Sequence, residues 1–350
     1  MQSKAKNKGK PNITTTEIAR RCGLSRPTVS AVLNGTRKVR ESTRKKVLDC
    51  IREQNFETGM ISKALVGELS YMVAVLASNL GSPFHMMMFR GVCEYLEAQG
   101  YHVLVHNVRS ENQPDPKTLA SLHAFRPAGY IILRGAEGID GAHAREIAEE
   151  GVPLVTQGRV EDFESHLVDF DNQAAMKSAT NYVIKQGHRR LGHVAGPTFS
   201  QGTQQRKMGF LESVVEHGIP MSDAMVVDAG ESAESGHDAA LEMLKDPDKR
   251  PTALMCFNDN VAVGVYRAAH ELSLEIPRDL SVVGFDGIDF GELLAPGLTT
   301  VDIVPTELGR EAARLLLHII REEVGQKYET RWVEPKLIVR GSVRRLKPPP

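Results

Sequence analysis

Apolar side chains near the start of the chain recur at helical spacing and predict two short helices joined by a tight turn over residues 14–34, TTTEIARRCGLSRPTVSAVLN. Ala19 is small enough for the helices to cross closely, and Gly23 suits a turn that needs either a positive φ or a close backbone approach. Ser25 can cap the second helix, and Pro27 is tolerated in its first turn. This pattern is typical of a helix-turn-helix, whose second helix lies in a DNA major groove.

The following segments predict the rest of a small helical domain and a linker. A third amphipathic helix is expected over 41–54, which completes a DNA-binding domain over 13–57. Residues 58–70 are too polar and too short for a strand, and we expect either a hinge helix that needs a partner to order it or a flexible linker. The lysine-rich residues 1–12 are expected to form a disordered basic arm.

From Tyr71 onward the pattern changes to short β-branched runs that alternate with helix-periodic segments. Strand–helix alternation of this kind implies parallel sheets with helices on both faces. The runs fall into two series, which predicts two α/β lobes whose strand ends face a shared cleft. The predicted strands are 71–77, 101–107, 128–133, 152–157, 191–196, 225–230, 252–257 and 281–286. The helical or loop segments after them are 86–99, 116–125, 141–149, 172–186, 204–217, 234–245 and 260–272.

Positive charge is concentrated at one end of the chain. Residues 1–66 hold 15 Lys and Arg against 5 Asp and Glu, a net charge of +10, whereas the remaining 284 residues hold 28 against 39, a net charge of −11. A basic patch next to a helix-turn-helix neutralises DNA phosphates, so the affinity for DNA should fall steeply as salt rises.

Composition narrows the class of protein further. Hydrophobic residues make up 41% of the 350 residues and charged residues 25%, which is ordinary for a globular protein. No apolar run approaches the length of a membrane span, and no secretory signal follows the basic start, so we expect a cytoplasmic protein without membrane contact. The four cysteines lack metal-ligand spacing and are expected to be buried free thiols, without a metal or other cofactor: Cys22, Cys50, Cys93 and Cys256.

Two other classes of protein fit the sequence less well. An enzyme is not expected, because the chain shows no nucleophile elbow, phosphate-binding glycine loop or metal-spaced cluster. The acid pairs Asp169/Asp171 and Asp286/Asp289 suit packing and helix capping better than acid–base catalysis. A periplasmic sugar-binding protein would account for two α/β lobes but not for the basic head.

The order and spacing of several motifs resemble the LacI–GalR family of bacterial transcriptional repressors. These motifs are EIARRCGLSRPTVSAVLNG, VRESTRKKVLDCIREQNF, VDFDN, GHRRLGHVAGP, RKMGF, FNDNVAVGVYRAAHELSLEIPRDLSVVGFDG and LTTVDI. The resemblance implies a repressor that binds operator DNA as a homodimer through its head and hinge. An effector between two lobes linked by three crossovers changes the DNA affinity through its differential affinity for two states.

The resemblance also implies the boundaries of the effector domain, which spans 71–345. Lobe 1 is expected to comprise 71–170 and 304–328, and lobe 2 to comprise 171–303 and 329–345, followed by a disordered tail over 346–350. The helices at 86–99 and 305–323 are candidates for the dimer interface. No leucine heptads of a tetramer-forming coiled coil are present at the C-terminus, so a dimer is expected.

Family positions further imply the residues that contact DNA. Those that read base edges are Arg26, Pro27 and Ala31, where Ala31 replaces an arginine common in relatives. Those placed for phosphates are Ser25, Thr28, Ser30 and Asn34. In the hinge, the implied DNA contacts are Lys63 and Leu65, and Leu65 matches a leucine that wedges between minor-groove base steps. Thr58-Gly59 stands in place of the usual Pro-Asn, so the hinge helix should be harder to order.

The implied effector contacts are Phe84, Arg206, Glu231, Asn258, Asp259 and Asp286. Arginine, aspartate and asparagine together suit a polyhydroxylated neutral ligand, because each hydroxyl both donates and accepts hydrogen bonds. A sugar or sugar derivative is therefore expected, with a purine or nucleoside as the alternative. Structural roles remain open: Asp286 as a cap, Asn258 in a turn, Arg206 paired with a surface acid and Phe84 in the core. His188 and His193 are expected to be structural.

Overall fold

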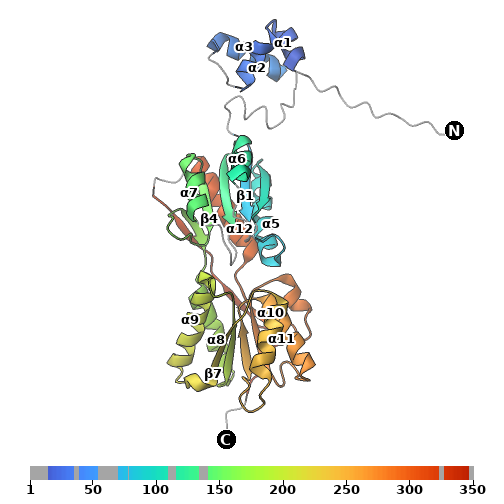
Figure 1. Ribbon diagram of the computed structural model, residues 1–350, viewed down its shortest axis with the longest axis vertical. Helices are drawn as coiled ribbons and strands as arrows, with labels where there is room; N and C mark the ends of the chain where they lie inside the picture. The colour runs from blue at the N-terminus through green and yellow to red at the C-terminus, as the bar shows by residue number, and fades with distance from the viewer. Residues whose placement is uncertain are drawn as a thin grey trace, which may run out of the picture. The chain divides into compact units, whose positions relative to one another are not determined.

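The computed structural model describes residues 15–34, 39–53, 70–77, 79–108, 116–133, 141–322 and 327–346. The predicted basic arm over 1–12 and hinge residues 58–69, with Lys63 and Leu65, lie outside the described residues. The three head helices belong to one compact unit and both β-sheets to another (Figure 1), and each is described by itself. Within the described ranges, no helix is long and apolar enough to span a membrane.

The head consists of α1 (Thr15–Cys22), α2 (Arg26–Asn34) and α3 (Glu41–Glu53), as the apolar spacing predicts. Gly23 adopts a φ of +61°, and a Cβ placed there would meet nothing within 4 Å. The turn therefore requires glycine for its left-handed backbone and not for a close approach. Six side chains form the buried centre of the head: Ile18, Ala19, Cys22, Val29, Val32 and Val47.

The first lobe is built on a six-stranded sheet in the order β11-β5-β4-β3-β1-β2. Its strands are β1 (Met72–Ala77), β2 (His102–Asn107), β3 (Gly129–Leu133), β4 (Leu154–Gln157), β5 (His166–Asp169) and β11 (Thr330–Trp332). The helices between them are α5 (Pro83–Ala98), α6 (Pro116–Ala124), α7 (Gly141–Glu149) and the later α12 (Pro305–Ile320).

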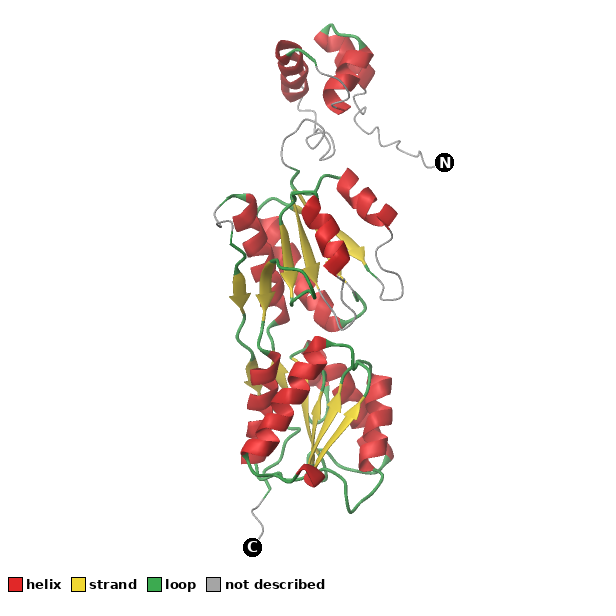
Figure 2. Cartoon of the chain, turned by 60° about the vertical axis from the view of Figure 1, so that its left-hand side comes forward, coloured by secondary structure: helices red, strands yellow, loops and turns green. Residues whose placement is uncertain are grey.

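The second lobe repeats this plan with a sheet in the order β12-β10-β9-β8-β6-β7, with helices on both faces (Figure 2). Its strands are β6 (Leu191–Ala195), β7 (Ala224–Asp228), β8 (Ala253–Cys256), β9 (Ser281–Asp286), β10 (Thr299–Asp302) and the antiparallel β12 (Lys336–Ile338). Its helices are α8 (Asn172–Lys185), α9 (Gln201–Glu216), α10 (Ala233–Leu244) and α11 (Asp259–Glu271), with short 3₁₀ turns at Met221–Asp223 and Asp289–Leu293.

The chain passes between the lobes three times, and the third passage corrects the predicted lobe boundary. Residues 329–345 were expected in lobe 2, but Thr330–Trp332 pair in parallel with β5 of lobe 1. Hydrogen bonds from Leu167 N–H to the Glu329 carbonyl and from Val333 N–H to the Asp169 carbonyl hold this short strand in the first sheet. The third crossover therefore lies at 333–335, between β11 and β12.

Helix α12 has its apolar face buried within the lobe, and its role at a dimer interface stays a prediction. It packs on α5 through two glycines: a Cβ at Gly91 would lie 1.9 Å from the Thr306 carbonyl oxygen, and one at Gly309 would lie 1.9 Å from that of Met88. Its other side covers β3, β4 and β5. On the other side of this contact, Met86 of α5 is exposed.

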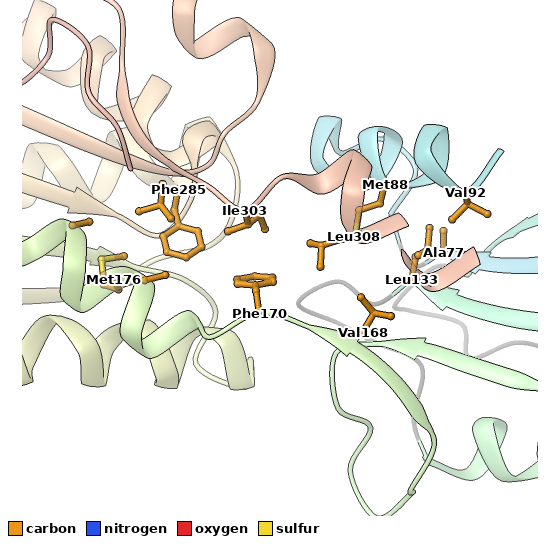
Figure 3. Close-up of a cluster of buried hydrophobic side chains, with 14 of the residues drawn as sticks. Ala77, Met88, Val92, Leu133, Val168, Phe170, Met176, Phe285, Ile303 and Leu308 are labelled. Carbon is orange, nitrogen blue, oxygen red and sulfur yellow. The ribbon is translucent and has the colours of Figure 1, made fainter. Parts of the chain in front are cut away.

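One apolar cluster runs from the first lobe through the crossovers into the second (Figure 3). Phe170 follows β5 at the first crossover, and Ile303 follows β10 at the second. The Phe170 ring lies 6.3 Å from that of Phe285, centroid to centroid, at the end of β9. The residues that link the lobes are thus packed directly beneath the strand ends, where a ligand is expected.

Candidate functional sites

The N-terminus of α2 presents the residues expected to contact DNA. The hydroxyl of Ser25 accepts a hydrogen bond from Thr28 N–H at 3.3 Å and lies 2.8 Å from the Thr28 hydroxyl, so Ser25 is the N-cap. Arg26 and Pro27, in the first turn, are exposed, whereas Thr28 and Ser30 are half-buried. An exposed arginine at the start of this helix is suited to a guanine edge.

Ala31 does not fit the expectation that it reads a base edge. Only 4% of this residue is exposed, because its side chain ends at Cβ and neighbouring atoms cover it. The arginine common in relatives would project beyond this point, and a methyl group does not. Asn34 ends α2, and its side chain lies outside the described residues.

A cavity of about 470 Å³ opens where strands of both lobes end. This volume suits a small ligand, since such sites commonly occupy roughly 300–1,000 Å³. Residues after β4 and β5 form one wall, and residues after β6, β8 and β9, with the first turns of α9, form the other. Of the residues predicted to contact the effector, the cavity wall includes Phe84, Arg206, Glu231, Asn258 and Asp286.

Arg206, in the second turn of α9, is held by four contacts with three residues. Its Nε donates to Asn172 Oδ1 at 2.8 Å, and its Nη1 donates to the Phe257 carbonyl oxygen. The guanidinium lies over the ring of Phe285 at 3.8 Å and over that of Phe257 at 4.5 Å from the centroids. The wall thus contains a cation whose orientation is fixed before any ligand enters.

Asp286 is the acid that accompanies this cation, 3.7 Å from Arg206 Nη1. It ends β9 with a φ of +111°, and Gly287 follows at +75°, so a sharp backbone turn brings its carboxylate into the wall. Burial raises the pKa of Asp286, and the Arg206 charge opposes this shift. Burial likewise lowers the pKa of Arg206 to about 10, which leaves it charged at neutral pH.

Asn258 lines the cavity, but both groups of its side-chain amide already form hydrogen bonds within the protein. Its Oδ1 caps α11 by accepting from Val261 N–H at 2.8 Å, and its Nδ2 donates to the Glu231 carbonyl oxygen at 3.1 Å. Asn258 therefore has a structural role, as a helix cap in place of the expected turn, and it also lines the cavity.

The prediction that Asp259 contacts the effector is wrong, because Asp259 does not line the cavity. Its carboxylate is fully buried and accepts from the Thr300 hydroxyl at 2.6 Å and from Ile288 N–H at 2.9 Å. Burial raises the pKa of Asp259 to about 7, and these hydrogen bonds oppose the shift. Asp259 thus ties α11 to the ends of β9 and β10, which positions Asp286 indirectly.

Phe84 and Glu231 face the cavity from different lobes. Phe84 begins α5, lines the cavity and also packs against the main apolar cluster, so its two predicted roles coexist. Glu231 Oε1 accepts a hydrogen bond from Asn79 Nδ2 at 3.3 Å, which connects the lobes across the cleft.

Several cavity residues were not among the predicted effector contacts: Gln157, Arg159, Asp169, Asn172, Phe199 and Phe257. Gln157, Arg159, Asp169 and Phe257 lie at or just after strand ends, and the rule that ligands bind at the carboxyl ends of parallel strands is the signal that could have found them. Phe199 is 67% exposed in the loop before α9.

The predicted structural histidines and cysteines lie elsewhere. His188 contacts Thr252, Ser281 and the Arg344 carbonyl, and His193 contacts the Met255 carbonyl, so both are held by the protein interior. All four cysteines are free thiols; Cys22 and Cys256 are buried, and Cys50 and Cys93 are half-buried.

Comparison with known proteins shows that a head of this kind and a ligand-binding domain of this kind occur together in other chains. Residues 14–58 match the model of bacterial regulatory proteins of the lacI family, and residues 180–343 match a periplasmic binding protein-like domain. The repressor PurR of Actinobacillus pleuropneumoniae serotype 3 is 28% identical over 335 residues, which cover 95% of this chain and 99% of PurR. The ribose operon repressor of Escherichia coli K12 is 29% identical over 334 residues, covering 94% and 99% of the two chains.

A solved structure shares the two-lobed fold. The crystal structure of a LacI family transcriptional regulator from Enterococcus faecium with bound ribose aligns with a TM-score of 0.71 and 25% identity, covering 79% of this chain and all of that one. A helix-turn-helix head joined to a two-lobed ligand-binding domain defines a class of transcriptional regulators. Within that class, this chain combines a head that matches the lacI family of bacterial regulatory proteins with a periplasmic binding protein-like domain.

Proposed function

We propose that this protein is an operator-binding transcriptional repressor, active as a homodimer in the cytoplasm, whose DNA affinity is set by a sugar or sugar derivative in the cleft. The observation that carries the proposal is the capped, basic N-terminus of α2 in the same chain as a fixed Arg206–Asp286 pair at a cavity of ligand size. The first feature suits DNA and the second suits a small polar molecule, and no catalytic step is needed for either.

The effector acts through its contacts with both walls of the cleft. Phe84 and Gln157 come from lobe 1, and Arg206 and Asp286 from lobe 2, so a ligand that contacts both favours one lobe arrangement. The shift in DNA affinity equals the ratio of the ligand affinities for the two arrangements. The packed crossover residues Phe170 and Ile303 lie in the path of that movement.

The proposed DNA contacts are of two kinds: contacts with base edges, which determine sequence specificity, and contacts with phosphates, which position the protein on the DNA. Arg26 and Pro27 read base edges, while Ser25, Thr28, Ser30 and Asn34 serve phosphates, and Lys63 and Leu65 engage the minor groove from the hinge. Ala31, being covered, is left without a base contact in this assignment.

A binding measurement with the full chain tests this function. Fluorescence anisotropy with duplex oligonucleotides from its own promoter region should give specific binding that weakens steeply with salt. Arg26→Ala should cost about 1–3 kcal/mol on the specific duplex and less on random duplex, and Leu65→Ala should show the same selectivity. An absence of duplex binding at low salt, or equal losses on both duplexes, would count against the assignment.

A purine effector is the second candidate, and the 28% identity to a PurR repressor favours it. A thermal-shift screen that compares sugars with purines separates the two, because a ligand of the native state raises the melting temperature. A shift with purines alone would replace the sugar in the proposal and leave the DNA-binding function intact.

A further inference from the structure

The charged and polar side chains that line the cleft indicate which net charge its ligand has, in addition to its class as a sugar. We infer that it accepts neutral or amino-substituted polyhydroxyl ligands and rejects their phosphorylated and carboxylated counterparts. This inference rests on the proposed function and makes the effector more specific.

The first argument is that the buried cation of the cleft is already engaged. The Arg206 guanidinium donates to Asn172 and to the Phe257 carbonyl, pairs with Asp286 and is stacked on two phenylalanine rings. An incoming phosphate would have to compete with these partners, and Asp286 would face it at short range. Arg206 is therefore placed to direct a hydroxyl group and not to neutralise an anion.

The second argument is the overall charge of the wall. Its arginines are Arg159 and Arg206, and its carboxylates are Glu161, Asp169, Glu231 and Asp286. Four acids against two arginines give a negative wall, and the excess persists if Asp286 takes up a proton. Like charges in a cleft of low dielectric constant repel an anionic ligand far more than they would in water.

The third argument is a hydrogen-bond acceptor that lacks a donor. Gln157 is 5% exposed and lines the cavity, and its Oε1 has no hydrogen-bond partner among the described residues. A buried acceptor of this kind costs about 1–3 kcal/mol unless a donor reaches it. Hydroxyl and ammonium groups supply such a donor, whereas ionised phosphate and carboxylate groups only accept.

Matched sugars test the inference on the full chain. The panel is ribose and ribose 5-phosphate, with glucose, glucosamine, glucose 6-phosphate and glucuronate, each at about 10 mM and equal ionic strength, read by melting temperature and then by calorimetry. We expect a neutral or amino member to raise the melting temperature and its anionic counterpart to bind at least about tenfold more weakly. An anion that binds as well as its parent, or a panel in which no neutral or amino member binds, would overturn the inference.

Variants locate the cause of the selectivity. Asp169→Asn combined with Glu231→Gln should narrow the gap between each parent sugar and its anion, whereas Glu242→Gln, on the exposed face of α10, should leave it unchanged. An unchanged gap in the double variant would overturn the charge argument. Duplex binding in the same preparation keeps the tests separate: an anionic hit with intact DNA binding overturns only this inference, and lost DNA binding overturns the proposed function.

Discussion

Oδ1 of Asp286 lies 3.7 Å from Nη1 of Arg206, with each side chain less than a tenth exposed. The two residues come from different elements, the end of β9 and the second turn of α9, and meet in the cavity wall. A buried pair of this kind contributes little net stability, but the loss of one partner leaves an uncompensated charge. We therefore expect its role to be the presentation of a polar surface to a ligand.

The first prediction concerns this pair. Arg206→Gln should lower the free energy of unfolding by about 3–5 kcal/mol, because Asp286 is left buried without its charge partner. Adding Asp286→Asn should restore most of the loss, which urea denaturation would measure. Equal stability of the single and double variants would show that the pair is not coupled.

Asp259 is predicted to stabilise the fold and not to contact the effector. Asp259→Ala leaves the Thr300 hydroxyl and the Ile288 N–H without their acceptor, and each buried orphan costs about 1–3 kcal/mol. We expect a loss of at least about 2 kcal/mol in denaturant unfolding. The exposed Asp289→Ala serves as the control, and a similar small effect for both variants would contradict the assigned role.

Stability should depend on pH through His237, which joins α10 to α11. Its Nδ1 lies 3.0 Å from Asp238 and its Nε2 lies 2.9 Å from Glu271, and both contacts raise its pKa above 6.5. The stabilisation is fully present below the unfolded pKa and is lost as the pH rises through the higher folded pKa. Glu271→Gln should therefore lower the melting temperature more at about pH 5.5 than at about pH 8.5. The reverse order would refute the assignment.

Ser25 is predicted to combine capping with a phosphate contact. Ser25→Ala should cost the head about 1 kcal/mol of stability. Ser25→Asp keeps a cap but brings a negative charge towards DNA. If the Ser25→Asp variant is stable but binds duplex DNA poorly, both roles are supported. If it binds duplex DNA fully, Ser25 serves only as a helix cap. Circular dichroism and anisotropy give the two readouts.

Phe199 is predicted to contact the effector, since an exposed ring at a polar cavity can stack on the apolar face of a sugar. Phe199→Ala should weaken a neutral sugar about tenfold, while Phe199→Tyr retains the affinity. Val215→Ala is a matched control, because Val215 is 65% exposed but lies outside the cavity, on the same helix that follows the Phe199 loop. Equal affinities of the Phe199→Ala variant and the control would exclude the contact.

Much of the fold could be predicted because its signals are local. Gly23 and Ser25 mark the turn and cap of the head, and the eight long β-branched runs each became a strand. The strands that escaped prediction, β5, β10, β11 and β12, have only three or four residues. Their pairing partners, not their own pattern, make them strands, which is why Thr330–Trp332 was assigned to the wrong lobe.

For the residues around the cavity, too, some features could be predicted from the local sequence and others depend on contacts between distant segments. Sequence determined the order and spacing of the motifs, and the family resemblance built on them implied Arg206, Asp286 and Phe84 as effector contacts, all of which line the cavity. Only the tertiary structure decided that Asp259 turns into the protein while Asp286 faces the cavity. Both acids come at or shortly after the end of a buried strand, and the donors that hold Asp259, Ile288 after β9 and Thr300 in β10, lie 29 and 41 residues away along the chain. Periodicity along a chain sets which elements form; the packing of distant elements sets where each side chain points.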